Sequence, residues 1–288
     1  MNAMGRAHAT ITSVLGITSA MSAAFGLVLA AGDGAQAQQI VSTGQSFLSA
    51  ELAVGSRHDD GRRDAGLVME IKPGWKTYWR APGEAGVPPR LDWSRSRNLS
   101  HVAIDWPRPE MFESFGYMTL GYGGRVVLPL TLTPEDPARP ITLALEADVG
   151  VCRDICVFET VQIERAIAPD DPDKDRTTIG VARLMVPEVG ATAGVSLVSC
   201  RITGAGEARD FTAQLSLPSE MVHPYVVLEG PQGSWFDDLE MTPAPDGYTL
   251  TATFHAPDGS SWIDRDAIVA TVLGETRAAE VWGCSTAG

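Results

Sequence analysis

The sequence is poor in positive charge. It holds 22 Lys and Arg residues against 36 Asp and Glu residues, which leaves a formal net charge of −14 at pH 7. Nucleic acids and anionic lipid surfaces bind proteins through clusters of basic side chains. We therefore expect no nucleic-acid partner and no adsorption to an anionic membrane.

Long hydrophobic runs are also scarce, and only one is long enough to resemble a membrane span. It extends from Ile11 to Ala31, follows Arg6 and is succeeded by the small-residue site Ala35–Ala37. This layout is typical of a secretory signal peptide, here residues 1–37, with cleavage before Gln38. A retained membrane anchor is the alternative, but several Ser and Thr residues dilute the run. We expect an exported protein with no membrane insertion after signal cleavage.

Several enzyme motifs are missing. The chain has no Gly-rich phosphate loop, no His-Glu-x-x-His zinc motif and no Gly-x-Ser-x-Gly elbow. Its five histidines are scattered, with none at ligand spacing from another. The aspartates of residues 170–175 are typical of a solvated linker rather than of an acid/base pair. No other constellation rivals the cysteines as a source of chemistry.

A sustained helical period is absent too. Short runs with a period near two recur instead between Gly- and Pro-rich turns, as in Gly66–Ile71, Arg125–Leu132 and Ile141–Ala147. Such runs predict antiparallel strands packed as an immunoglobulin-like sandwich. A second set extends from Val195–Ile202 to Ala278–Trp282. The predicted fold is therefore all-β, with two immunoglobulin-like β-sandwich domains in tandem.

A charged segment with two prolines separates the two sets of strands. Residues 169–177 are predicted to be a linker. The first β-sandwich domain is then expected at 38–168 and the second at 178–288, with a short helix at Ile179–Met185 near the start of the second.

Cysteines are few but even in number. In an exported protein, four cysteines predict two disulfides. Along a straight strand Cys152 and Cys156 would lie roughly 13 Å apart, too far for a bond, so the chain must turn at Arg153–Ile155. The turn is either a hairpin loop or a single helical turn, and the flanking apolar runs favour the hairpin. For Cys200 and Cys284, far apart in sequence, we expect a structural bridge that ties down the C-terminus.

The close cysteine pair admits three interpretations. The first is redox exchange, because a small ring removes little entropy from the unfolded chain and is prone to reduction. The second is a structural disulfide, which is common in exported β-domains. Local charge does not distinguish these interpretations, because the negative charge of Asp154 opposes the positive charge of Arg153. A metal site is least supported: His101 with Met111 or Met118 could complete a copper site, but lone His and Met residues more often serve packing.

Two aromatic stretches with several prolines, 74–93 and 106–118, are expected to be too irregular for a strand or a helix. Such loops can cap a neighbouring site or fill one end of a sandwich. In the second stretch, Phe112, Phe115 and Tyr117 could shield a reactive disulfide, and plain packing is the alternative.

Three motifs occur in a fixed order: GWKTYWRAPGEAGVPPRLDW, then FESFGYMTLGYGGRVVLPL, then ADVGVCRDICVFET. The region that carries them, about residues 45–165, resembles the N-terminal periplasmic domain of DsbD-type and ScsB-type thiol:disulfide interchange proteins. The Cys-x-x-x-Cys spacing is nearer to the ScsB-type branch. The second half is similar to the companion β-domain of that branch.

The resemblance implies a periplasmic immunoglobulin-like domain whose cysteine pair takes electrons from a membrane-embedded thiol donor and passes them to oxidised exported client proteins. It assigns Cys156 as the attacking thiol, Cys152 as the resolving thiol, and Phe112, Phe115 and Tyr117 as the cap. No cofactor or metal is implied, because the sulfurs carry the electrons. The chain would then be a protein-disulfide reductase.

Members of that family continue into a multi-span membrane region and a thioredoxin-like domain, whereas this sequence stops at Gly288. We expect those parts to be separate polypeptides, unless the function has changed. The rival hypothesis is a binding or scaffold module, in copper handling or cytochrome maturation, with a structural Cys152–Cys156 disulfide.

Overall fold

The computed structural model describes residues 38–39 and 46–284, apart from 115, 232 and 257–262. The predicted signal peptide, 1–37, lies outside the described residues. Within them, no helix is long and apolar enough to cross a membrane.

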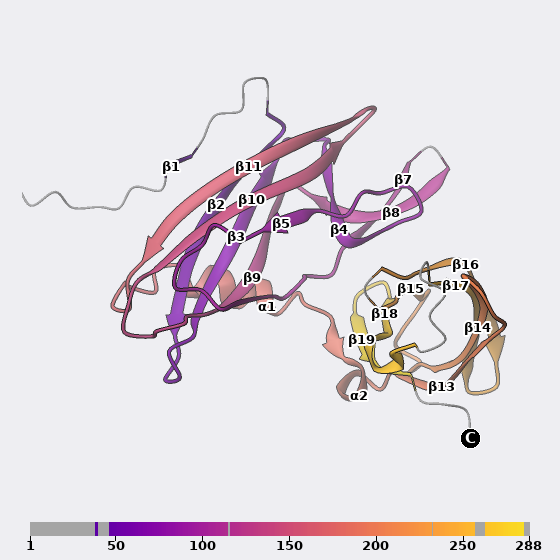
Figure 1. Cartoon of the computed structure of the whole chain (residues 1–288). Coiled ribbons are helices and arrows are strands. Elements are labelled where there is room, and N and C mark those ends of the chain that lie inside the picture. Colours follow the sequence, from indigo (N-terminus) through magenta and orange to yellow (C-terminus); the bar gives the residue numbers. More distant parts are fainter. Residues whose placement is uncertain (1–37, 40–45, 115, 232, 257–262, 285–288) are drawn as a thin grey trace, which may run out of the picture. The chain divides into compact units, whose positions relative to one another are not determined.

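Two antiparallel sheets form the first half of the chain (Figure 1). One has the strand order β2 (Leu48–Arg57), β3 (Arg63–Ile71), β9 (Arg125–Thr133) and β6 (His101–Ile104). The other has the order β1 (Gln38–Gln39), β11 (Cys156–Ile167), β10 (Ile141–Cys152), β4 (Lys76–Gly83), β8 (Tyr117–Gly123) and β7 (Glu110–Ser114), with β5 (Arg90–Asp92) also paired to β10.

The core of this half consists of the inward residues of the alternating strands. Leu67 and Leu130 from one sheet and Leu143 and Leu145 from the other are all buried in one apolar cluster. Trp79 of β4 is fully buried there as well. Burying side chains of this size is the main source of stability for such a sandwich.

The second half has two further four-stranded sheets. One has the order β13 (Ser196–Thr203), β14 (Ala208–Ser216), β17 (Gly247–His255) and β16 (Trp235–Ala244). The other has the order β12 (Glu188–Val189), β19 (Ala278–Trp282), β18 (Val269–Leu273) and β15 (Tyr225–Glu229), and the short helices are α2 (Gly190–Ala193) and η1 (Arg265–Ala267). Phe211, Leu250 and Phe254 belong to the core between them. The sheet of β12, β19, β18 and β15 is called the second-half sheet below.

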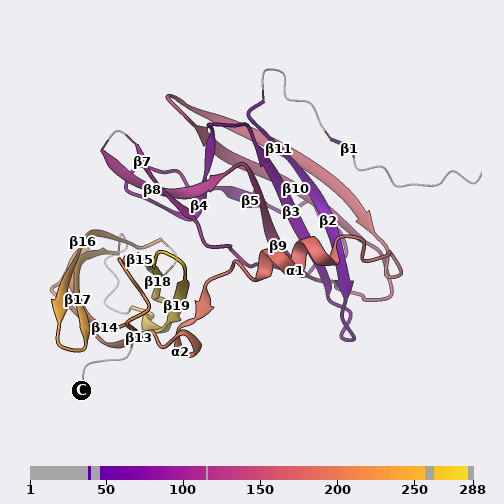
Figure 2. The same ribbon diagram turned by 180° about the vertical axis from the view of Figure 1, so that it is seen from behind.

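Helix α1 (Arg176–Arg183) lies on the outer face of β2, β3 and β9, as Figure 2 shows. Its buried residues Ile179 and Ala182 form a cluster of their own with apolar side chains of that face. Gly66 makes room for the helix, since a Cβ there would lie 3.2 Å from Ile179 Cγ1.

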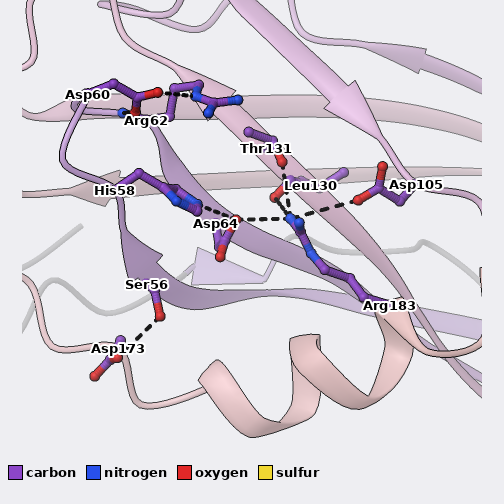
Figure 3. Close-up of polar contacts among 10 residues, drawn as sticks. All are labelled: Ser56, His58, Asp60, Arg62, Asp64, Asp105, Leu130, Thr131, Asp173 and Arg183. Atoms are coloured by element: carbon purple, nitrogen blue, oxygen red, sulfur yellow. Dashed lines mark hydrogen bonds and ion pairs between the residues drawn. The ribbon is translucent and has the colours of Figure 1, made fainter.

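Polar contacts anchor the end of α1 (Figure 3). Arg183 Nη2 donates to Asp64 Oδ1 at 2.9 Å and to Thr131 Oγ1 at 3.0 Å. His58 Nε2 lies 2.9 Å from the same Asp64 oxygen, and Asp105 is the second carboxylate near Arg183, at 3.7 Å. The carboxylate of Asp64 is thus shared by two side chains.

The residues before α1 also contact the first half. Asp175 pairs with Val54 of β2 twice, donating its backbone N–H to the Val54 carbonyl and accepting from the Val54 N–H through Oδ2. Ser56 donates to Asp173, also drawn in Figure 3. The acidic segment therefore follows the edge strand β2 before the helix starts.

The all-β class is confirmed, with 57% strand and about 5% helix. The expectation that 74–93 and 106–118 are irregular is wrong, because β4 and β5 lie in the first stretch and β7 and the start of β8 in the second. Prolines and glycines near the ends of these strands obscure their short alternation in the sequence. The division into domains at 169–177 stays a prediction.

Candidate functional site

The two close cysteines end the long β10–β11 hairpin (Figure 1). Twelve residue pairs lead from Ile141↔Ile167 to Cys152↔Cys156, so the cysteines face each other directly. Arg153–Ile155 forms the loop, closed by a hydrogen bond from Arg153 N to the Ile155 carbonyl. Cys152 and Cys156 are disulfide-bonded with a Cα separation of 4.1 Å. The hairpin alternative of the sequence analysis is thus the one that the chain adopts.

The two sulfurs have different surroundings. Cys152 is 2% exposed, whereas Cys156 lies on the surface. Near Cys156 the hairpin presents two apolar side chains to solvent, Ile155 at 65% and Phe158 at 73% exposure. An incoming thiol or disulfide can therefore approach Cys156 across an apolar surface, while Cys152 is shielded.

Tyr78 of β4 contacts the buried sulfur. Its hydroxyl donates to Cys152 Sγ at 3.0 Å and lies 3.7 Å from Cys156 Sγ. Burial raises the pKa of Tyr78, so the hydroxyl stays protonated and remains a donor. Gly150 makes room for the ring, since a Cβ there would lie 3.2 Å from Tyr78 Cε2. A hydroxyl in this position stabilises a thiolate on Cys152.

Lys76 pairs with Cys152 across the β4–β10 ladder. Its side chain is buried and donates through Nζ to Thr119 Oγ1 at 2.9 Å. Nζ also lies 4.9 Å from the centre of the Phe112 ring, and Thr119 Oγ1 donates to the Phe112 carbonyl. Burial lowers the pKa of Lys76. The ammonium group thus joins β4, the neighbour of the strand that ends at Cys152, to the β7–β8 hairpin.

The charge in the loop is balanced locally. Arg153 Nε donates to Asp154 Oδ2 at 2.9 Å, and both side chains are exposed. The Arg153 guanidinium also lies 5.3 Å from the Trp75 ring centre. Because solvent screens this pair, its effect on the cysteines is small.

The residues expected to cap the cysteines have different positions. Phe112 is in β7 and contacts Lys76, Tyr117 begins β8 and is 53% exposed, and Phe115 lies outside the described residues. Cys200 and Cys284 are disulfide-bonded in the second half with a Cα separation of 5.7 Å. Their structural role and the cap stay predictions.

The residues weighed as copper ligands lie on different sheets. His101 is in β6 of one sheet, and Met111 and Met118 are in β7 and β8 of the other. In the part of the chain that the structure describes, no group of three or more His, Cys, Asp or Glu side chains could hold a metal ion.

Sequence reasoning did not single out Tyr78 or Lys76. Both lie in the aromatic stretch 74–93, which the sequence predicts to be irregular. Lys76 and Tyr78 alternate with Thr77 and Trp79, and this short strand signal could have placed them on one face. Their approach to the cysteines depends on the pairing of β4 with β10, which the sequence does not reveal.

Comparisons with known proteins agree on the first half of the chain. The family model described as "Thiol:disulfide interchange protein DsbD, N-terminal" matches residues 44–167. The crystal structure of the N-terminal periplasmic domain of ScsB from Proteus mirabilis is similar, with a TM-score of 0.63 and 20% sequence identity over 87% of this chain and 98% of that one. Among curated proteins no match is found. The likeness to the ScsB domain shows the same fold. Residues 44–167 are therefore a DsbD-type N-terminal domain, a thiol:disulfide interchange module whose disulfide pair is Cys152–Cys156.

Proposed function

We propose that this chain carries out thiol–disulfide exchange in the periplasm through Cys152 and Cys156. Electrons pass from a membrane-embedded thiol donor to disulfides of oxidised exported proteins. The observation that carries the proposal is the asymmetry of the pair: Cys156 is exposed, whereas Cys152 is buried with the Tyr78 hydroxyl 3.0 Å from its sulfur.

Reduction of the pair follows from this geometry. A donor thiolate attacks the exposed Cys156 Sγ, forms a mixed disulfide and releases Cys152 as a thiolate, which the Tyr78 hydroxyl stabilises. The second donor thiol then attacks the donor sulfur of the mixed disulfide and releases Cys156. The donor leaves oxidised by two electrons, and the pair is left as two thiols.

Reduction of a client runs through the same intermediates in reverse. The Cys156 thiolate attacks a client disulfide, one client sulfur leaves as a thiolate, and a mixed disulfide forms. The Cys152 thiolate then attacks Cys156 Sγ and releases the second client sulfur. The client gains two electrons, and the Cys152–Cys156 bond is restored.

The reduction potential of the pair tests this proposal. The oxidised chain is equilibrated with glutathione buffers, free thiols are alkylated, and each disulfide is quantified by peptide mass spectrometry. We expect Cys152–Cys156 to reduce above roughly −250 mV, in the range of exchange proteins. The Cys200–Cys284 bond serves as the internal control and is expected to stay oxidised. A value below about −300 mV for Cys152–Cys156 would indicate a staple and favour the scaffold module.

Cysteine variants test the order of attack. Cys156→Ser is expected to abolish client reduction, because the exposed nucleophile is lost. Cys152→Ser keeps the nucleophile but lacks the resolving thiol, so it should accumulate covalent client complexes that are visible on non-reducing gels. Accumulation of such complexes by Cys156→Ser instead would reverse the two assignments.

A further inference from the structure

Arg80 lies in β4, two residues after Tyr78, and contacts three strands of the second-half sheet. It donates through Nε to Glu229 Oε1 at 3.0 Å and through Nη2 to Glu229 Oε2 at 2.9 Å. Nη2 also contacts Glu280 and lies 3.5 Å from Thr271 Oγ1. These partners belong to β15, β19 and β18 respectively.

The cluster is largely removed from solvent. The side chains of Arg80, Glu229 and Glu280 are 20%, 24% and 15% exposed, and the Arg80 guanidinium lies 4.4 Å from the Trp79 ring centre. Burial disfavours the charge on Arg80, but the hydrogen bonds and charges of both glutamates outweigh it and raise the pKa. Removing Arg80 would leave two partly buried carboxylates without their shared cation, which is costly.

Apolar contacts continue this interface. Tyr225, Val227 and Glu229 lie on the same face of β15. Tyr225 and Val227 pack against the core of the first half. Leu273 and Ala278 of the neighbouring strands are buried in that same core cluster. The opposite face of the second-half sheet belongs to the second core, through residues such as Val226 and Val272. The second-half sheet therefore packs against both hydrophobic cores, one on each of its faces.

We propose that the second half of the chain holds β4 in place and thereby positions Tyr78 at the cysteine pair, with Arg80 as the positioning residue. The family match ends at residue 167, and it assigns no role to the strands beyond. The redox part of this inference rests on the proposed function. The structural part, the support of β4 by the second-half sheet, does not.

Hydrogen exchange of the oxidised full-length chain tests the structural part. In Arg80→Met, the backbone amides of β4 are expected to exchange at least about tenfold faster, because the strand loses its support, while those of β14 stay unchanged. Arg277→Met is the matched control: Arg277 pairs with Glu188 on the surface and leaves β4 untouched. Unchanged exchange in β4 of Arg80→Met would overturn the proposal.

A milder variant keeps the test valid if Arg80→Met does not fold. Glu280→Gln removes one carboxylate and leaves Arg80 paired with Glu229, so the fold is expected to survive. Its β4 amides should exchange faster than in the wild type but slower than in a variant that also carries Glu229→Gln. Equal exchange in the wild type and both of these variants would contradict the support of β4 by this cluster.

A second readout tests the link to the cysteines. The pH midpoint for alkylation of reduced Cys152 is measured in the wild type, Arg80→Met, Tyr78→Phe and the double variant. We expect each single change to raise the midpoint, and the double variant to match Tyr78→Phe, because Arg80 acts through Tyr78. If the double variant instead shows the sum of the two single rises in the midpoint, Arg80 does not act through Tyr78. Arg80→Lys should restore part of the difference between the midpoints of Arg80→Met and the wild type.

The two experiments separate the possible failures. If wild-type Cys152–Cys156 is not reduced by glutathione, the proposed function is wrong, and hydrogen exchange still decides whether the second half holds β4. If the pair exchanges but the Arg80 variants leave β4 and the Cys152 midpoint unchanged, the further inference is wrong and the proposed function stands.

Discussion

At the scale of single residues, side chains of the same or similar type in the site differ in their burial and in their contacts. Two cysteines share one bond, yet Cys152 is buried and receives the Tyr78 hydroxyl, while Cys156 is open to solvent. Of the nearby basic side chains, Lys76 is buried on the cysteine strand's neighbour and Arg153 is exposed beside Asp154. Residues of the same or similar type thus differ in their exposure to solvent and in their charged neighbours. Local packing sets these differences.

Tyr78→Phe removes one hydrogen-bond donor and little volume. A hydrogen bond to a charged sulfur favours the thiolate, so its loss is expected to shift the alkylation midpoint of reduced Cys152 to higher pH. The measurement is the pH dependence of Cys152 alkylation followed by mass spectrometry. Tyr248→Phe, in β17, is the matched control and should leave the profile unchanged. An alkylation midpoint of Cys152 at lower pH in Tyr78→Phe would contradict the assigned donor role.

Lys76 predicts a pH dependence of stability. Because its pKa in the folded chain lies below the ordinary 10.5, the unfolded chain binds more protons between the two values. Stability contributed by this residue therefore rises with pH across that window. We expect the free energy of unfolding of the wild type, relative to that of Lys76→Met, to increase as the pH rises towards 10.5. Exposed Lys72→Met is the control and should parallel the wild type.

At the scale of elements, one local contact and one contact that is remote in sequence build the site. The β10–β11 hairpin brings the cysteines together locally, but β4 must pair with β10 to bring Tyr78 to them. Helix α1 covers the other sheet through a contact that is also remote in sequence, with Ile179 against a surface that includes Gly66. Small residues mark both close approaches, Gly150 beneath Tyr78 and Gly66 beneath Ile179.

Ile179→Ala tests the docking of α1. Ile179 is 2% exposed, so its truncation should lower the free energy of unfolding by roughly 2–4 kcal/mol. Val181→Ala, on the same helix at 57% exposure, should change it by less than about 0.5 kcal/mol. Urea denaturation of both variants measures the difference. Equal losses in the two variants would show that α1 does not bury the face that carries Ile179.

At the scale of the whole molecule, the two disulfides have unequal effects on the unfolded chain. The Cys152–Cys156 bond spans a sequence separation of 4 and the Cys200–Cys284 bond one of 84. Loop-closure entropy therefore makes the longer bridge worth about 4–5 kcal/mol and the shorter one about 2 kcal/mol. This difference suits the shorter bond to cycling and the longer one to stability.

Paired alanine variants measure these contributions. Changing both Cys200 and Cys284 to alanine should lower the free energy of unfolding clearly more than changing Cys152 and Cys156, by about 2 kcal/mol or more. Denaturant titrations of the full-length variants give both values. A larger loss for the short pair would indicate a structural staple there and count against the redox assignment.

The sequence by itself determined the class of the fold and the presence of a turn between the close cysteines. Alternating runs such as Ile141–Ala147 predict strands, and Cys152 and Cys156 can bond only across a turn at 153–155. Local signals suffice for these features, because the period of a strand and the reach of a disulfide depend on nearby residues. The ordered motifs around the pair also led to the family that the match at 44–167 confirms.

Only the tertiary structure decided which residues surround the cysteines. The strand that holds Lys76, Tyr78 and Arg80 was expected to be an irregular loop, and its pairing with β10 depends on contacts more than seventy positions away, such as Val151↔Thr77. The exposure of Cys156 and the contact of Arg80 with Glu229 have the same origin. Burial and long-range pairing are properties of the whole packed chain, because they depend on how separate strands are brought together.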